Sequence, residues 1–257
     1  MIWQGSFMSL KKQPSSRRRL TGISILKRNL AENNIQRARN PVTPSRMTVR
    51  GQFPSKKMQR MVAWESQLER RACYLFEFSV SIDSFREQPR TFILPFKDKI
   101  RRYTPDFEVV WSTGEVYYFE IKPSHKIDQL KEYFNAISIY LEEKGLGFSV
   151  LTDVELISPI REHNLILLRS YQNYILDQQH INELQIISSL DECCFSFCDL
   201  ADYFESDIVV YALIAQNYLF ADLNKSLQQS HSILINKKRD ITDENNLFIY
   251  RTAPNFE

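Results

Sequence analysis

Cysteine and histidine are scarce in this 257-residue chain, and their positions exclude two kinds of site. The cysteines lack the even spacing of a disulfide framework; they are Cys73, Cys193, Cys194 and Cys198. Together with four scattered histidines, they also lack the paired ligand spacing of a zinc centre. The sequence therefore predicts neither a disulfide scaffold nor a cysteine–histidine metal site.

Long apolar runs are also missing. No stretch approaches the roughly 18–20 apolar residues that cross a bilayer, and the apolar part of residues 1–10 is too short for a secretion signal. We therefore expect a cytoplasmic protein without a membrane partner. What the chain does contain is an ordinary globular composition, 43% apolar and 25% charged, with 17 Phe and 12 Tyr to build a core.

The net charge of +2 conceals a strong gradient along the chain. Residues 1–60 contain 14 Lys and Arg against a single acid, Glu32. Residues 61–150 contain 12 basic and 14 acidic side chains, and residues 151–257 contain 7 and 16. A basic arm suits a polyanion such as DNA, because each neutralised phosphate releases condensed counterions. The acidic last third would repel DNA and is better suited to a protein partner.

We predict that residues 1–57 form this basic arm, largely irregular apart from a short helix near residues 23–38. The alternative is a solvated tail without a partner. The expected DNA contacts are Arg17, Arg18, Arg19, Lys56 and Lys57.

The pattern changes at Met58, where a folded segment is expected to begin. Apolar residues recur every three or four positions over 58–76, which predicts a helix of about five turns. An antiparallel meander, a second helix and a further strand follow, so an α+β core is expected over 58–155. The predicted strands span 80–85, 90–95, 102–111, 115–122 and 148–152, and the second helix spans 127–141.

After Pro159 the chain becomes helical and acidic. A long helix is expected over 172–190, and the elements that follow are short. Helices over 197–204 and 208–216 and strand-like segments over 218–222 and 232–237 outline a small, mainly helical winged-helix domain over 156–257. A small helical bundle would give a similar pattern.

A hairpin over 102–122 brings together the groups that could carry chemistry. Glu120 and Lys122 lie two apart on one strand, so their side chains share a face of the sheet. If Asp106 points to the same side, two carboxylates meet beside one ammonium. Two such carboxylates repel unless a divalent cation holds them, and Mg²⁺ is the fitting ion, with the Ile121 carbonyl as another oxygen ligand.

This arrangement suits metal-assisted hydrolysis of a phosphodiester, with Lys122 orienting or deprotonating the attacking water. The alternative is that these are solvated surface charges. Upstream, Glu65 and Glu69 lie four apart, so we expect them to be neighbours on one face of the predicted helix. A carboxylate there could reach the hairpin as a further ligand, through water, or pair with Arg70 and Arg71.

Five short motifs in this order resemble the N-terminal endonuclease domain of TnsA-type transposition proteins. They read Glu65-Ser-Gln-Leu-Glu69, Leu75-Phe-Glu-Phe, Ser84-Phe-Arg-Glu-Gln-Pro89, Tyr103-Thr-Pro-Asp-Phe107 and Phe119-Glu-Ile-Lys-Pro123. That family is a branch of the restriction-endonuclease-like PD-(D/E)xK superfamily. The resemblance implies a mixed β-sheet core flanked by helices over about residues 58–152, and more weakly a winged-helix portion behind it.

Motif by motif, the resemblance implies catalytic roles for Glu69, Asp106, Glu120 and Lys122. Asp106 and Glu120 would bind Mg²⁺, for which Mn²⁺ substitutes, and Lys122 would be the catalytic lysine. Glu69 matches the helical acid at the motif's spacing, with Glu65 as the competing candidate. Gln88 is a supporting residue of less defined role.

The resemblance further implies a DNA endonuclease subunit of a heteromeric transposase, bacterial and nucleoid-associated when assembled. Such a subunit hydrolyses the 5′ (non-transferred) strand at transposon ends during cut-and-paste transposition. The implied partners are double-stranded DNA, a TnsB-like transposase with an Asp-Asp-Glu site, and a TnsC-like AAA+ ATPase. Two alternatives stay open: a stand-alone nuclease in restriction, repair or phage defence, and a non-enzymatic winged-helix DNA-binding protein.

Overall fold

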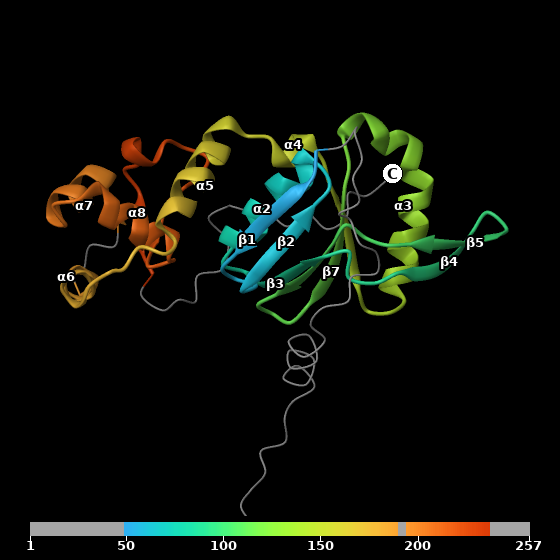
Figure 1. Ribbon diagram of the computed structural model, residues 1–257, viewed down its shortest axis with the longest axis horizontal. Helices are drawn as coiled ribbons and strands as arrows, with labels where there is room; N and C mark the ends of the chain where they lie inside the picture. The colour runs from blue at the N-terminus through green and yellow to red at the C-terminus, as the bar shows by residue number, and fades with distance from the viewer. Residues whose placement is uncertain (1–48, 190–193, 237–257) are drawn as a thin grey trace, which may run out of the picture. The chain divides into compact units, whose positions relative to one another are not determined.

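A four-stranded mixed sheet forms the centre of the computed structural model, which describes residues 49–189 and 194–236 (Figure 1). Its strand order is β3-β6-β7-β8. The first three strands are antiparallel neighbours, whereas β8 runs parallel to β7 because helix α3 carries the chain across the sheet between them. The bounds are β3 Ile82–Glu87, β6 Phe107–Trp111, β7 Val116–Ile121, α3 Ile127–Glu142 and β8 Gly147–Leu151.

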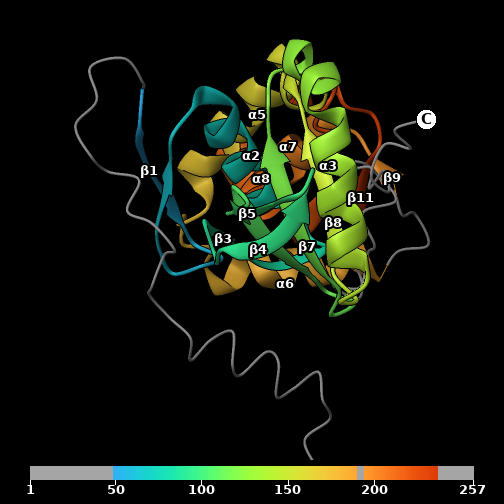
Figure 2. The ribbon, with the colours of Figure 1, turned by 90° about the vertical axis from the view of Figure 1, so that its right-hand side faces the viewer.

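Two helices cover opposite faces of this sheet (Figure 2). Helix α2 (Gln67–Phe78) packs Phe76 against Phe107 and Phe119 on one face. Helix α3 packs Phe134 on the other face, where Tyr118 and Phe148 are buried. Because alternate residues of β7 enter different cores, Phe119 and Ile121 point to the α2 side, and Tyr118 and Glu120 point away from it.

The hairpin of β1 (Gly51–Ser55) and β2 (Arg60–Trp64) corrects the predicted helix over 58–76. Met61, Val62 and Trp64 fit a helical spacing, but in the structure they belong to a strand. Helix α2 begins only after Ser66, whose Oγ accepts the Glu69 N–H at 3.1 Å as an N-cap. The sheet and helix that carry the site are therefore preceded by ordered strands from residue 51 onward.

The predicted strand over 102–111 is two strands, because Pro105 offers no N–H to a ladder. Its first part is β5 (Lys99–Tyr103), which pairs with β4 (Phe92–Phe96) in a separate two-stranded sheet. The segment 90–95, predicted as a strand of the central meander, therefore pairs in this separate sheet instead. The remaining hairpin, β6 and β7 joined through Ser112, Thr113 and Gly114, is confirmed.

The segment after β8 contains short helices and a small sheet. The predicted helix over 172–190 is shorter in the structure, because it begins only after the N-cap Asp177 and ends at Ser188. A further helix, which was not predicted, begins at Pro159 and ends at Tyr171. A three-stranded sheet follows in the order β10-β11-β9. The bounds are α4 Asp153–Leu156, α5 Pro159–Tyr171, α6 Gln178–Ser188, β9 Cys194–Phe195, α7 Phe197–Tyr203, α8 Asp207–Ala215, β10 Leu219–Phe220 and β11 Ile233–Ile235.

Within residues 49–189 and 194–236, no helix has the length and apolar character needed to cross a bilayer. The short helix expected near residues 23–38 lies outside the described residues, as do Arg17, Arg18 and Arg19. The division of the chain at residues 57 and 155 stays a prediction.

Candidate active site

The hairpin β6–β7 places Asp106 and Glu120 at the same end of the central sheet. Phe107 pairs with Phe119, so the residues just outside this pair, Asp106 and Glu120, are neighbours across the two strands. Pro123 follows Lys122 and ends the strand, since proline cannot continue the ladder. The site therefore lies where β6 begins and β7 ends.

The ammonium of Lys122 lies between the two carboxylates. Its Nζ is 2.7 Å from Glu120 Oε1 and 3.3 Å from Asp106 Oδ2. Asp106 Oδ2 also accepts the backbone N–H of Ile121 at 2.8 Å, and the Ile121 carbonyl accepts from Lys122 Nζ at 3.3 Å. The expectation that these three side chains meet on one side of the sheet agrees with this geometry.

Burial and mutual charge perturb the acid–base behaviour of this cluster. Burial, followed by the charge of Asp106, raises the pKa of Glu120 to about 7. Burial alone would lower the pKa of Lys122, but the charges of Asp106 and Glu120 outweigh it and raise that pKa above its ordinary value. The lysine therefore keeps its proton here, and Glu120 ionises within the physiological range.

Tyr103 is a fourth member of the site, which the sequence reasoning did not assign. Its hydroxyl is buried and donates to Glu120 Oε2 at 2.9 Å. Each oxygen of Glu120 thus has its own donor, Lys122 on one and Tyr103 on the other. The sequence did contain one indication of a role for Tyr103, since this residue opens the Tyr-Thr-Pro-Asp motif. Its contact with Glu120, 17 positions away, depends on how the chain folds.

Glu69 lies in the first turn of α2, and its carboxylate accepts from the Glu65 N–H at 2.7 Å and from Ser66 Oγ at 3.0 Å. Burial, followed by the charge of Asp106, raises the pKa of Glu69 to about 7. The electrostatic influence of Asp106 therefore extends to this helix terminus. Glu65 precedes the helix, so the prediction that both acids share one helix face is wrong.

Gln88 connects the helix terminus to Asp106, the residue that precedes β6. Its backbone N–H donates to the Asp106 carbonyl at 2.9 Å, and its side-chain Nε2 donates to Glu65 Oε2 at 3.2 Å. A positive φ of 42° holds this residue in an uncommon backbone conformation just before Pro89. Its Oε1 is buried and accepts no hydrogen bond within the described part of the chain.

The oxygen atoms present fit a hard divalent cation. Two carboxylates, the Ile121 carbonyl and the Gln88 oxygen without a donor are ligands, direct or through water, that Mg²⁺ and Mn²⁺ accept. Within residues 49–189 and 194–236, no group of three or more His, Cys, Asp or Glu side chains is arranged as a metal centre. A metal ion between Asp106 and Glu120 would have to displace the Lys122 ammonium from its present contacts.

Two predicted DNA contacts make interactions inside the protein. Lys57 Nζ donates to the carbonyls of Phe76, Ser79 and Ile82 at 2.9, 2.5 and 2.6 Å, near the end of α2. Lys56 Nζ donates to the Gln172 carbonyl at 2.5 Å. Both ammonium groups thus donate hydrogen bonds within the fold, and a phosphate contact by either stays a prediction.

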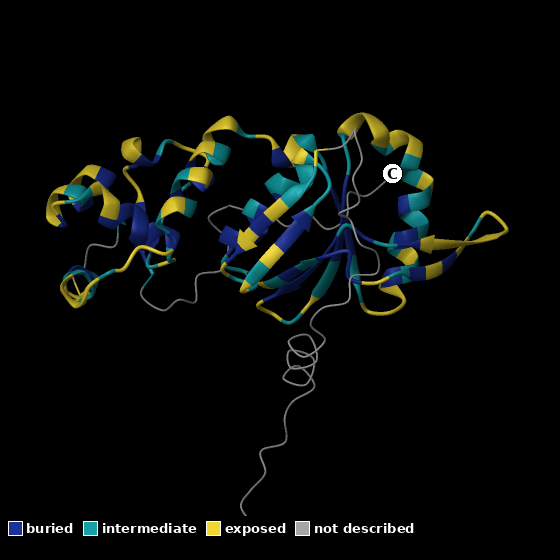
Figure 3. Cartoon of the chain, viewed as in Figure 1, coloured by how far each residue is buried: buried dark blue, intermediate teal, exposed yellow. Residues whose placement is uncertain are grey.

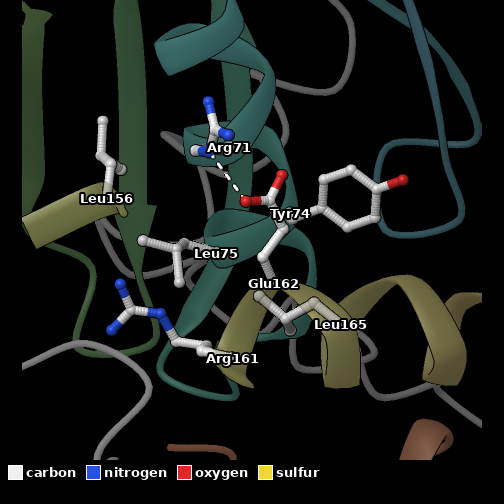
Figure 4. A pocket seen from close by; sticks show the side chains of 7 residues that line it. All are labelled: Arg71, Tyr74, Leu75, Leu156, Arg161, Glu162 and Leu165. Carbon is white, nitrogen blue, oxygen red and sulfur yellow. Dashed lines mark hydrogen bonds and ion pairs between the residues drawn. The ribbon is translucent and has the colours of Figure 1, made fainter. Parts of the chain in front are cut away.

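A small pocket between α2, α4 and α5 is separate from this site (Figure 4). It is lined by Arg71, Tyr74, Leu75, Leu156, Arg161, Glu162 and Leu165. The ion pair of Arg71 Nε with Glu162 Oε2, at 3.0 Å, joins α2 to α5 at its edge. None of the residues assigned to the carboxylate site lines it.

Residues 79–153 match the family model of the TnsA-like endonuclease N-terminal domain. The resemblance to TnsA-type endonucleases is confirmed. The matched segment includes Gln88, Asp106, Glu120 and Lys122, and it leaves Glu69 and the helices after β8 outside. No curated protein matches the chain. The mixed sheet flanked by α2 and α3 is compatible with a restriction-endonuclease-like core, and the matched family indicates a nuclease related to transposition.

Proposed function

We propose that the chain is the metal-dependent DNA endonuclease subunit of a heteromeric transposase and hydrolyses the 5′ (non-transferred) strand at transposon ends. The observation that carries this proposal is the contact of Asp106, Glu120 and Lys122 inside the segment that matches the TnsA-like endonuclease family. A buried carboxylate, Glu120, and a second one, Asp106, whose side chain is 11% exposed, lie beside one lysine. This is a costly arrangement for stability alone, which favours a functional reason for it.

Asp106, Glu120 and the Ile121 carbonyl would hold Mg²⁺, with Glu69 acting through a water and Gln88 accepting from a bound water. The metal supplies charge that stabilises the phosphate and favours ionisation of a bound water. In the hydrolytic step the water oxygen would bond to phosphorus while the water gives up a proton to solvent. The bond from phosphorus to the leaving oxygen would break, and that oxygen would take up a proton from solvent.

Lys122 would act as a charged donor rather than as a base. Its pKa is raised by Asp106 and Glu120, so loss of its proton is opposed in the present arrangement. With Mg²⁺ held by the two carboxylates, the Lys122 ammonium would be available to contact the attacking water or a phosphate oxygen. Tyr103 would hold the ligand oxygen of Glu120 in place through its 2.9 Å hydrogen bond.

The segment after β8 would be a winged-helix-like domain that binds a partner. Its chain order supports this: helix α6, strand β9, helices α7 and α8, then strands β10 and β11. Helix α8 is buried at every position from Val209 to Ala215, so it does not present a face that could read DNA. This favours a protein partner, and we propose a TnsC-like ATPase for this domain and a TnsB-like transposase for activation.

The proposal is tested by a cleavage assay on labelled transposon-end DNA with Mg²⁺, with and without the cognate transposase. We expect near inactivity of the isolated chain and 5′-strand nicking in the presence of the transposase. Vigorous cutting by the isolated chain would favour the stand-alone nuclease. Absence of cutting with every partner, together with DNA binding, would favour the non-enzymatic alternative.

A further inference from the structure

The hairpin β4–β5 is a two-stranded ribbon that projects past α3 (Figure 1). Its strands pair from Phe92–Tyr103 to Phe96–Lys99, so Lys97 and Asp98 alone form the turn. Both turn residues have positive φ, 47° and 55°, as a tight two-residue hairpin turn requires. The ribbon is therefore short, and the tight turn at its tip contains Lys97 and Asp98.

The two faces of this ribbon differ. The inner face carries Phe92, Leu94 and Tyr103, which are buried in the core that α3 covers, and also the exposed Arg101 and Lys99, which pair with Leu94 and Phe96. On the outer face Ile93 pairs with Arg102 and Pro95 with Ile100; Ile93 is 60% exposed and Ile100 is 77% exposed. The outer part of the ribbon is largely exposed (Figure 3).

Positive charge is concentrated on the same ribbon. Residues 97–102 hold Lys97, Lys99, Arg101 and Arg102 against one acid, Asp98, although residues 61–150 as a whole are slightly acidic. Lys97 pairs with Glu132 at 2.5 Å. The other three cations are exposed and make no ion pair with any described residue. Four cations on one projecting ribbon, three of them unpaired, are complementary to a polyanion.

The ribbon also runs directly into the catalytic residues. Strand β5 ends at Tyr103, which donates to Glu120, and Asp106 follows three residues later. At about 3.4 Å per residue, Lys99 lies roughly 14 Å along the strand from Tyr103. That length corresponds to about four base steps of B-DNA. Cations on β5 would therefore meet DNA close to the phosphate that is cut.

We propose that the β4–β5 ribbon is a DNA-binding element that lies in the major groove beside the scissile phosphate. A two-stranded ribbon has the width that this groove admits. Arg102 on the outer face and Lys99 and Arg101 on the opposite face contact phosphates along its two walls. The exposed Ile93 and Ile100 contact the apolar parts of the groove. This inference rests on the proposed function, since it takes the substrate to be duplex DNA.

The test is a salt titration of duplex binding by the full chain without divalent metal, so that no cutting occurs. The variant Lys99→Ala/Arg102→Ala is compared with Lys144→Ala/Lys225→Ala, which removes the same charge from exposed positions outside the ribbon. If each ribbon cation meets one phosphate, the slope of log affinity against log salt falls by about 1.8 in the ribbon variant. The ratio of wild-type to variant affinity for the duplex should then be about 12-fold smaller at 200 mM salt than at 50 mM salt.

An unchanged slope in the ribbon variant, or an equal fall in the control variant, would overturn the proposal. Both substitutions lie on exposed side chains, and an unchanged thermal midpoint establishes that the fold is kept. The outcomes distinguish failure of the ribbon proposal from failure of the proposed nuclease function. A reduced slope in a protein that never cuts DNA leaves the ribbon as a DNA contact and removes the nuclease. Cutting together with an unchanged slope leaves the nuclease and removes the ribbon contact.

Discussion

Replacing Tyr103 by phenylalanine removes one hydroxyl from the site and tests whether it keeps Glu120 ionised. The lost bond is the 2.9 Å hydrogen bond to Glu120 Oε2, in a buried position. A hydrogen bond to a charged group contributes about 1.5–3 kcal/mol, and one pKa unit corresponds to about 1.4 kcal/mol. The pKa of Glu120, about 7 in the wild type, should therefore rise by about one to two units.

The consequence is a pH-dependent loss of metal affinity. At pH 7.5 the ionised fraction of Glu120 falls from about three quarters to between about one quarter and a few per cent, so Mg²⁺ should bind about 3- to 25-fold more weakly. At pH 9 between about one half and nine tenths of Glu120 is ionised, and the loss shrinks to about twofold or less. Isothermal titration calorimetry at the two pH values measures both affinities.

Tyr118→Phe is the matched control, because Tyr118 donates to the buried Glu108 at 2.7 Å on the same face of the sheet. It removes an equivalent bond without touching the site, so its Mg²⁺ affinity should equal that of the wild type. An equal loss of affinity at both pH values in Tyr103→Phe, or the same loss in the control, would refute the reasoning and indicate a general packing effect.

Three further predictions follow from the same structure. Lys122→Ala should leave Mg²⁺ binding nearly intact and suppress strand cutting, and Lys122→Arg should also cut poorly because a guanidinium has a different shape; full cutting by the arginine variant would contradict this shape requirement. Burial raises the pKa of Glu69 to about 7, above an unfolded value near 4.5, so its ionisation costs stability progressively as pH rises through that window. In urea unfolding, Glu69→Gln should therefore gain stability relative to the wild type between pH 5 and pH 8, and a constant difference would contradict this. Deleting residues 1–50 should weaken DNA binding strongly at low salt and less at high salt, and an unchanged salt slope would show that the arm does not contact DNA.

Much of the site was accessible from the sequence because its members lie close along the chain. Alternation on one strand places Glu120 and Lys122 together, and a three-residue turn brings the strand after Asp106 alongside them. Helix α3 was equally accessible, because its buried residues Phe134, Ile137 and Leu141 recur at helical spacing.

What escaped prediction depends on contacts between distant residues. Met61, Val62 and Trp64 satisfy a helical spacing, and only their pairing with residues 51–55 makes them a strand. Tyr103 joins the site because β5 pairs with β4 rather than with β6, a choice that no local pattern reveals. The raised pKa values of Glu69 and Glu120 come mainly from burial, which is known only once α2 and the sheet have packed.

The most direct test of a metal-dependent nuclease centred on Asp106 is single-turnover cutting of end-labelled transposon-end DNA, with the cognate transposase present. We expect the wild type to cut the 5′ strand with Mg²⁺ or Mn²⁺ and not with EDTA. Asp106→Ala should retain a cooperative thermal transition and cut nothing, because it loses a ligand that also organises Ile121 and Lys122. Cutting by Asp106→Ala at the wild-type rate, or undiminished cutting by the wild type in EDTA, would contradict this account.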